Sequence, residues 1–250
     1  MTCALEINHL YFRYKEFALE DVNMNLHLGE QKALVGLNGS GKTTLFKLIL
    51  GLLEPESGTI HIFERKVERE SLWEIRKDVG FLFQNPDDQL FAPTVWEDVA
   101  FGPRNLGMNP EEVEQRVTWS LGMVGMSDFV NRPVNKMSHG EAKRVALAGI
   151  IAMRPKILLL DEPFAGLDFP MISTMVEIIE NLRNEGISVL YTTHNRFFLE
   201  NWADSVAVLH DGKLIYDGLV EDALQDPSIT QQTGNWDELG RRMREYRGLA

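Results

Sequence analysis

The chain has 250 residues, a mass of 28.5 kDa and 44% hydrophobic residues, which suits one large α/β domain or such a domain with an inserted lobe. Its net charge of −12 argues against nonspecific nucleic-acid binding, and we expect no nucleic-acid partner. No apolar run approaches the roughly 18–20 residues of a membrane span, the first residues lack the order of a signal peptide, and the single cysteine allows no internal disulfide.

The first part of the chain predicts a small antiparallel sheet. Residues 22–28 alternate strictly, with Val22, Met24, Leu26 and Leu28 on one side, as in a half-buried strand. We expect residues 5–14 and 59–63 to join this sheet. Gln31–Val35 ends in an apolar run and predicts a buried strand beside it.

A glycine-rich segment follows that buried strand. Residues 36–43 read Gly-Leu-Asn-Gly-Ser-Gly-Lys-Thr and match G-x-x-x-x-G-K-[ST] at every fixed position, which predicts a phosphate-binding loop. A helix is expected over 43–53, ending at Gly51 and Pro55, and its N-terminus would face the phosphates. Lys42 supplies a positive charge for the β- and γ-phosphates, and the Thr43 hydroxyl suits Mg²⁺. The residues expected to bind nucleotide here are Gly36, Asn38, Gly39, Ser40, Gly41, Lys42, Thr43 and Thr44.

The middle of the chain is rich in helix starts. Thr94 with Glu97, Asn109 with Glu112 and Ser138 with Glu141 each have the spacing of a capping box. We interpret residues 85–150 as a helical lobe inserted into an α/β domain that spans 1–225.

The last third returns to short apolar strands. Ile157–Leu160 and residues 187–192 are typical of buried parallel strands, and residues 206–216 of a hairpin turning at Asp211-Gly212. The first of these strands ends in Asp161 and Glu162, which would reach the magnesium shell and a water molecule in line with the γ-phosphate. Residues 226–250 form an extension, expected to be an amphipathic helix that is solvated or makes a regulatory or dimer contact.

These motifs, together with Gln84, Asp168 and His194, occur in the order of the ATP-binding-cassette (ABC) ATPases, and the resemblance covers about residues 3–220. It implies a P-loop NTPase fold of class α/β, with a RecA-like mixed-sheet core, an antiparallel β subdomain and an inserted helical subdomain. It also implies ATP and Mg²⁺ as cofactors. In this family two cassettes face head to tail, so that Ser138 and Gly140 would complete the ATP site of a second chain, most simply an identical one.

The resemblance assigns roles to further residues. Tyr14 would stack on adenine, with Tyr11 as the rival candidate. Glu162 would polarise water, and His194 would contact the γ-phosphate and orient that water. Gln84 would link magnesium and water to the helical lobe, so that the expected magnesium ligands are Thr43, Gln84 and Asp161. Asp168 would lie in the loop that spans the dimer and also suits the N-terminus of the helix that follows.

Two residues depart from the family pattern in the segment at 137–141. His139 replaces a glycine, and Glu141 replaces the usual glutamine. Glu141 either weakens the attraction for nucleotide or turns away from it. If both changes disable the site, the chain would be a nonhydrolysing regulatory module.

Residues 84–103 resemble, more narrowly, the energy-coupling ATPases of vitamin and transition-metal importers, particularly their cobalt and nickel branch. The resemblance implies a protein at the cytoplasmic face of the cell membrane, bound to integral membrane coupling and substrate-binding subunits. These would insert helices into a groove near 84–103. The apolar anchors would come from Leu90, Phe91, Val95, Trp96 and Phe101, unless these pack in the core of the lobe. Cobalt is the expected solute, with nickel or a vitamin such as biotin as alternatives. A soluble ABC ATPase outside transport is the rival class.

Overall fold

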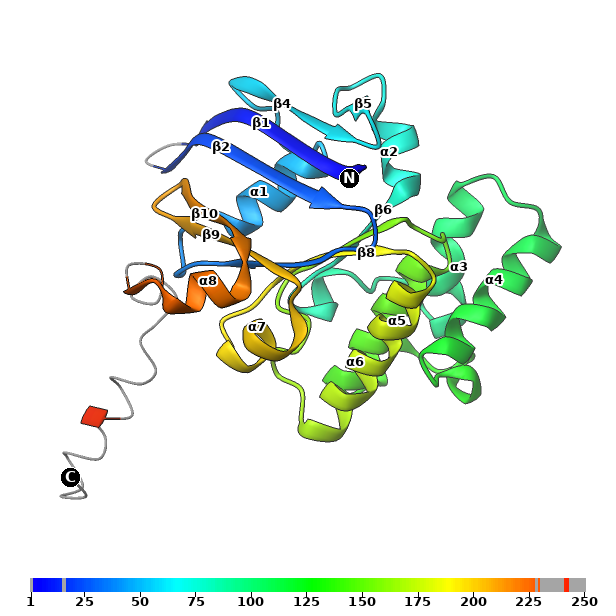
Figure 1. The fold of residues 1–250 in the computed structure, drawn as a ribbon. Helices are drawn as coiled ribbons and strands as arrows, with labels where there is room; N and C mark the ends of the chain where they lie inside the picture. Colours follow the sequence, from blue (N-terminus) through cyan, green and yellow to red (C-terminus); the bar gives the residue numbers. More distant parts are fainter. Residues whose placement is uncertain (1, 15–16, 228, 230–240, 243–250) are drawn as a thin grey trace.

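The computed structural model describes residues 2–14, 17–227, 229 and 241–242. Most of the predicted extension at 226–250 therefore lies outside the described residues. None of the helices formed by the described residues has the length and hydrophobicity of a transmembrane segment. The fold is α/β, with two sheets and helices that pack against both faces of the larger one (Figure 1).

The larger sheet is mixed, as predicted. β9 (Ser205–His210) pairs antiparallel with β10 (Lys213–Leu219), and all other pairs are parallel. Its strands lie in the order β10, β9, β3 (Gln31–Val35), β8 (Ser188–Thr192), β7 (Ile157–Leu160) and β6 (Val79–Leu82). Because parallel strands share one direction, the carboxyl ends of β3, β8, β7 and β6 meet at one edge.

The smaller sheet is antiparallel, also as predicted. Its strands lie in the order β2 (Phe17–His27), β1 (Cys3–Tyr14), β4 (Ser57–Ile62) and β5 (Arg65–Lys66). Placing Leu28 on the buried face of β2 was wrong. The strand ends at His27, where a turn bonds the Glu30 N–H to the His27 carbonyl, and Leu28 is exposed in that turn.

Helix α1 (Lys42–Ile49) lies between the two sheets. Leu45, Phe46, Leu48 and Ile49 are all fully buried. These residues join one apolar cluster with the inner face of the small sheet and one face of the large sheet. The helix ends before the predicted limit at residue 53, because Gly51 takes a left-handed φ of 62° just past its end.

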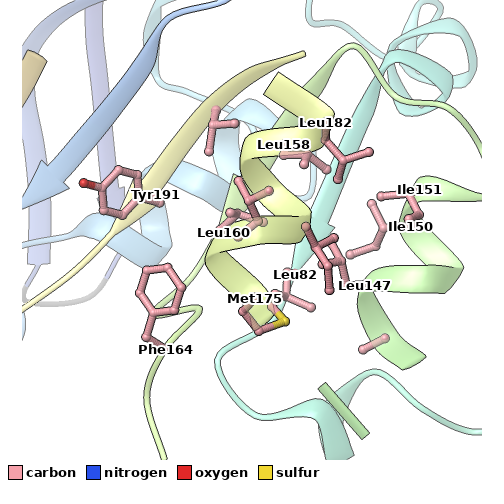
Figure 2. Close-up of a cluster of buried hydrophobic side chains, with 14 of the residues drawn as sticks. Leu82, Leu147, Ile150, Ile151, Leu158, Leu160, Phe164, Met175, Leu182 and Tyr191 are labelled. Carbon is pink, nitrogen blue, oxygen red and sulfur yellow. The ribbon is translucent and has the colours of Figure 1, made fainter. Parts of the chain in front are cut away.

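The other face of the large sheet is covered by a second apolar cluster. Figure 2 shows Leu158 and Leu160 of β7 beside Met175 and Leu182 of α6 (Phe169–Asn184). The remaining helices are α2 (Leu72–Asp78), α3 (Val95–Asn105), α4 (Pro110–Met123), α5 (His139–Ile151), α7 (Arg196–Trp202) and α8 (Val220–Gln225). Short 3-10 turns occupy Pro86–Asp88, Ser127–Phe129 and Val134–Lys136. Thr94, Asn109 and Ser138 cap α3, α4 and α5, as predicted.

The β9–β10 turn connects three parts of the chain. Asp211 and Gly212 have φ of 44° and 77°, the pair of positive values that a tight hairpin turn requires. The Gly212 N–H donates to the Ser40 carbonyl at 3.1 Å, and the Gly212 carbonyl accepts from the Glu20 N–H at 2.9 Å. A Cβ at position 212 would lie 1.8 Å from the Ala18 carbonyl oxygen. The turn therefore holds the loop at 36–41 against β2.

We predict that Gly212→Ala lowers the free energy of unfolding by about 3 kcal/mol or more, because left-handed strain adds to a backbone collision. Gly29→Ala is the matched control. Gly29 has a similar φ of 69° and no atom within 4 Å of the added carbon, so that only the left-handed strain of about 1–2 kcal/mol applies. Urea unfolding of both variants measures the difference, and equal losses would contradict the collision.

Candidate functional site

The glycine-rich loop at 36–41 connects β3 to α1. Gly36 and Gly41 have φ of 152° and 112°, and a Cβ would lie 2.1 Å from the Leu209 carbonyl oxygen at Gly36 and 2.5 Å from Phe17 Cζ at Gly41. Lys42 Nζ donates to the Gly36 and Leu37 carbonyls at 2.8 and 3.1 Å, so its ammonium group lies over the loop. Burial lowers the pKa of Lys42, while Glu162 and Asp161 act to raise it.

Asp161 joins the ends of three elements. Its carboxylate accepts from Thr192 Oγ1 at the end of β8 at 2.7 Å and from Thr43 Oγ1 in α1 at 3.1 Å. Thr192 Oγ1 also accepts from the Glu162 N–H at 2.8 Å. These bonds hold the predicted acidic pair, the start of α1 and the end of β8 in one arrangement.

Glu162 lies beside His194. The distance from Glu162 Oε1 to His194 Nε2 is 3.2 Å. Glu162 Oε1 is buried, and no donor among the described residues meets hydrogen-bond geometry with it. Burial raises the pKa of Glu162, the Asp161 charge raises it further and Lys42 opposes both. Burial, and then the Lys42 charge, lowers the pKa of His194. A carboxyl group with a raised pKa beside an imidazole with a lowered one is typical of a proton-transfer site.

These side chains line one cavity of about 810 Å³. Gln84, which follows β6, lies in the same wall. The predicted residues in its lining are Tyr14, Asn38, Gly39, Gly41, Lys42, Thr43, Thr44, Gln84, Asp161, Glu162 and His194. The volume is in the range of sites for nucleotide-sized ligands. The structure therefore brings together predicted residues from five segments of the sequence.

An aromatic wall was only partly predicted. Tyr14 lines the cavity and Tyr11 is not among the lining residues, but Phe12 and Phe17 also line it. Phe12 and Tyr14 alternate along β1, and Phe17 of β2 pairs with Tyr14. The period of two along a strand could have indicated Phe12 from the choice of Tyr14.

The cavity also offers oxygen ligands for a cation. Thr43 Oγ1 and Asp161 Oδ2 are 3.1 Å apart, and Gln84 shares the cavity. Hydroxyl, carboxylate and amide oxygens suit Mg²⁺, which binds few protein groups and keeps water or phosphate oxygens as its other ligands. In the part of the chain that the structure describes, no three His, Cys, Asp or Glu side chains group to hold a metal ion. The predicted magnesium ligands fit a site of this sparse kind.

Ser138, Gly140 and Asp168 are not among the residues that line this cavity. Ser138 caps α5, and Gly140 lies against Met171 of α6, where a Cβ would be 2.9 Å from Met171 Cε. Asp168 accepts from the Met171 N–H at 3.0 Å and caps α6, as predicted. The segments at 138–140 and 165–168 therefore lie together at the ends of α5 and α6, apart from the chain's own glycine-rich loop.

The structure decides how Glu141 is oriented. Its carboxylate accepts from the Ser138 N–H at 2.8 Å and from Arg132 Nη1 at 2.9 Å. The Ser138 backbone bond, followed by Arg132, lowers the pKa of Glu141. Its charge is thus directed back onto its own chain and balanced there. Sequence reasoning did not single out Arg132, because nothing in the spacing places it near the start of α5.

Lys143 was also missed. It is fully buried, and its Nζ donates to the carbonyls of Glu162 at 3.0 Å and Ala165 at 3.3 Å. Burial lowers its pKa to about 8, although Glu162 and Asp161 act to raise it. The available signal was helical spacing, which puts Lys143 on the same stripe as the buried residues Ala146, Leu147 and Ile150.

A second, apolar groove of about 500 Å³ lies beside the segment at 84–103. Of the five anchors considered, Phe91 and Phe101 line it and pack edge to face, with 63% and 48% of their surface exposed. None of the other three lines the groove: Val95 is fully buried in the core, and the partly buried Leu90 and Trp96 pack against that core, as in the alternative of core packing. The groove also includes the exposed residues Trp73 and Phe83 from outside α3, and Ala146, Gly149, Ile150 and Met153 from α5 and its end.

Comparisons with known proteins agree with this geometry. The ABC transporter family matches residues 19–165. The energy-coupling factor transporter ATP-binding protein EcfA of Methanocaldococcus jannaschii is 45% identical over 226 residues, which are 89% of this chain and 81% of that protein. EcfA of Methanothermobacter thermautotrophicus is 44% identical over 91% of this chain and 75% of its own. The structure of cbiO1 from Clostridium perfringens, part of the ABC transporter complex cbiONQ, has a TM-score of 0.82 and 32% identity, covering 98% of this chain and all of that one.

We predict that Glu141→Gln lowers the free energy of unfolding by about 1 kcal/mol at pH 7, because the amide still accepts from Ser138 but loses the charge that pairs with Arg132. The pKa of Glu141 is lowered in the folded state, so the stabilisation is present above its unfolded pKa and is lost as pH falls through the folded value. The variant and wild type should converge in strongly acidic urea titrations.

Glu112→Gln is the matched control. Glu112 accepts from the Asn109 N–H at 2.9 Å in the same capping position of α4. Among the described residues Glu112 forms no ion pair within 4 Å, and Arg116 on the same helix acts on it only through charge at longer range. If Glu112→Gln lowers the free energy of unfolding at pH 7 as much as Glu141→Gln does, the charge pair with Arg132 does not explain the loss.

Proposed function

Because the chain belongs to the ABC transporter family, we propose that it is the ATP-hydrolysing energy-coupling subunit of a membrane importer, acting through two identical chains. The chain binds ATP and is an ATPase. The observation that carries the proposal is the cavity in which Lys42, Asp161, Glu162 and His194 converge at one sheet edge. We further propose that residues 1–225 form the ABC domain, with residues 85–150 as its helical lobe.

In this proposal the chain's own groups bind ATP and activate water. The loop N–H groups, the N-terminus of α1 and Lys42 bind the phosphates, and Tyr14 stacks on adenine beside Phe12 and Phe17. Mg²⁺, held by Thr43, Asp161 and Gln84, supplies positive charge to the phosphate oxygens when bound. A water molecule attacks the γ-phosphorus and gives a proton to Glu162. The bond between the γ-phosphorus and the β–γ bridging oxygen breaks, and ADP leaves. His194 Nε2 orients that water and stabilises the transferring group.

A second copy of the chain completes each site. Ser138 is exposed at the N-terminus of α5, where free backbone N–H groups and the helix dipole favour an anion. Glu141 does not place its charge toward such an anion, because Arg132 and the Ser138 N–H hold it. This supports a hydrolysing cassette over a nonhydrolysing regulatory module. Phe169 and Phe197 are exposed near Asp168 and His194 and would be covered in the closed pair.

The apolar groove is the proposed docking site for helices of the membrane partners. Trp73, Phe83, Phe91 and Phe101 offer exposed aromatic surface for a helix laid in the groove. The relatives named as energy-coupling factor proteins and the likeness to a cbiONQ component favour a transporter at the cytoplasmic face of the membrane over a soluble ABC ATPase. Cobalt is the proposed solute, with nickel and a biotin-type vitamin as alternatives.

Glu162→Gln tests the chemistry. The amide keeps the shape of the side chain but cannot accept the water proton, so we expect kcat to fall by roughly 10²–10³-fold while ATP binding is retained. Phosphate release and equilibrium binding of ATP measure the two effects. Turnover near that of wild type would remove Glu162 from the role of general base.

Phe91→Glu tests the groove. A charge in the apolar groove should weaken docking of a partner helix, so co-purification of the membrane subunits and vesicle uptake should fall at least about tenfold, with the ATPase activity of the isolated chain unchanged. Leu219→Glu is the control, because Leu219 is 62% exposed on β10, away from the groove. Uptake of Co²⁺, Ni²⁺ and biotin by the same vesicles identifies the solute. Equal effects of the two variants would contradict docking at Phe91.

A further inference from the structure

Lys143 is the one lysine in the described residues with no exposed surface. Both of its hydrogen-bond acceptors are backbone carbonyl oxygens, those of Glu162 and Ala165. Taking an ammonium group out of water is costly, and two neutral acceptors compensate for this less well than a carboxylate would. Stability alone therefore gives little reason for a lysine here.

The acceptor at Glu162 belongs to an unusual residue. Glu162 has a φ of 47°, in the left-handed region that side chains other than those of glycine, asparagine and aspartate seldom adopt. Its N–H donates to Thr192 Oγ1 at 2.8 Å, and its carbonyl accepts from Lys143 Nζ at 3.0 Å and from the Ala165 N–H at 3.1 Å. The backbone of Glu162 is thus bonded on both sides, whereas its Oε1 makes no hydrogen bond among the described residues.

We propose that Lys143 is a positioning residue for ATP hydrolysis: its ammonium group, by holding the Glu162 and Ala165 carbonyls, keeps Glu162 in the left-handed conformation that directs its carboxylate into the cavity. Lys143 itself touches neither nucleotide nor water. The inference rests on the proposed role of Glu162 as general base.

The position of Lys143 gives the contact a further consequence. Lys143 lies on α5, and the same helix lines the apolar groove with Ala146, Gly149 and Ile150, one to two turns further on. A displacement of α5 relative to β7 would move the ammonium group away from the Glu162 carbonyl. The alignment of Glu162 therefore depends on how α5 is placed, through a bond inside one chain.

The test compares Lys143→Met and Lys143→Gln in the purified full-length chain, by phosphate release over a range of Mg·ATP concentrations and by thermal unfolding. Methionine has a similar length and no donor, so we expect kcat to fall at least about tenfold with KM within about twofold, since small misplacements of a catalytic group have effects of this size. Glutamine can donate to both carbonyls and should restore kcat at least about threefold over the methionine variant. A lysine that only fills space would leave kcat unchanged, because apolar replacement of a buried charge is often tolerated.

Two controls separate the outcomes. Lys32→Met removes another buried ammonium group, which pairs with Asp217 at 2.6 Å outside the cavity, and should change stability but not kcat. Glu162→Gln, measured in parallel, reports on the base itself: if it stays active, the proposed role of Glu162 fails and the inference with it. If Glu162→Gln is inactive while Lys143→Met keeps wild-type kcat, or Lys143→Gln restores nothing, only the role of Lys143 is overturned.

If Lys143→Met does not fold, a lower kcat of Lys143→Gln at unchanged KM and melting temperature supports the proposal, and an unchanged kcat contradicts it.

Discussion

The parallel pairing of β3, β8, β7 and β6 is the constraint on which the rest of the structure depends. Each strand pairs with its neighbour in a parallel register, so the four chain segments leave the sheet at the same edge. The loop at 36–41 and Asp161-Glu162 directly follow β3 and β7, and His194 and Gln84 are the second residues after β8 and β6. The hydrogen bonds of the sheet therefore bring these segments together, although they are far apart in the sequence.

The same strands explain why the site can hold costly groups. Alternate residues of β7 enter different apolar clusters: Ile157 and Leu159 pack toward α1, and Leu158 and Leu160 toward α5 and α6 (Figure 2). Both faces are buried, so the strand is fixed from two sides. Burial at this edge of the sheet perturbs the pKa values of Lys42, Glu162 and His194. Burying these groups lowers the stability of the fold, and the two apolar clusters offset that loss.

The sequence predicted the fold class and the residues of the cavity better than it predicted which surface or partner a side chain faces. A motif such as residues 36–43 determines its own local geometry, and most of the predicted site residues line the cavity, whereas Ser138, Gly140 and Asp168 do not. The roles of all these residues stay predictions. For Leu90, Val95 and Trp96 the choice between core and groove stayed open in the sequence, because an apolar helical stripe alone does not show which of the two surfaces it faces. Arg132 and Lys143 were missed because the bonds that matter here, from Arg132 to Glu141 and from Lys143 to Glu162 and Ala165, join residues 9 to 22 positions apart, which spacing within a helix does not reveal.

The ion pair between Arg132 and Glu141 also constrains which substitutions these two positions can accept during evolution. A change of Glu141 to the glutamine usual in the family would keep the bond from the Ser138 N–H but leave the Arg132 guanidinium without its counter-charge. A change of Arg132 alone would leave a carboxylate at the start of α5 with no cation to balance it. The two positions are therefore expected to drift as a pair, and lineages that carry glutamine at 141 should have lost the need for a cation at 132.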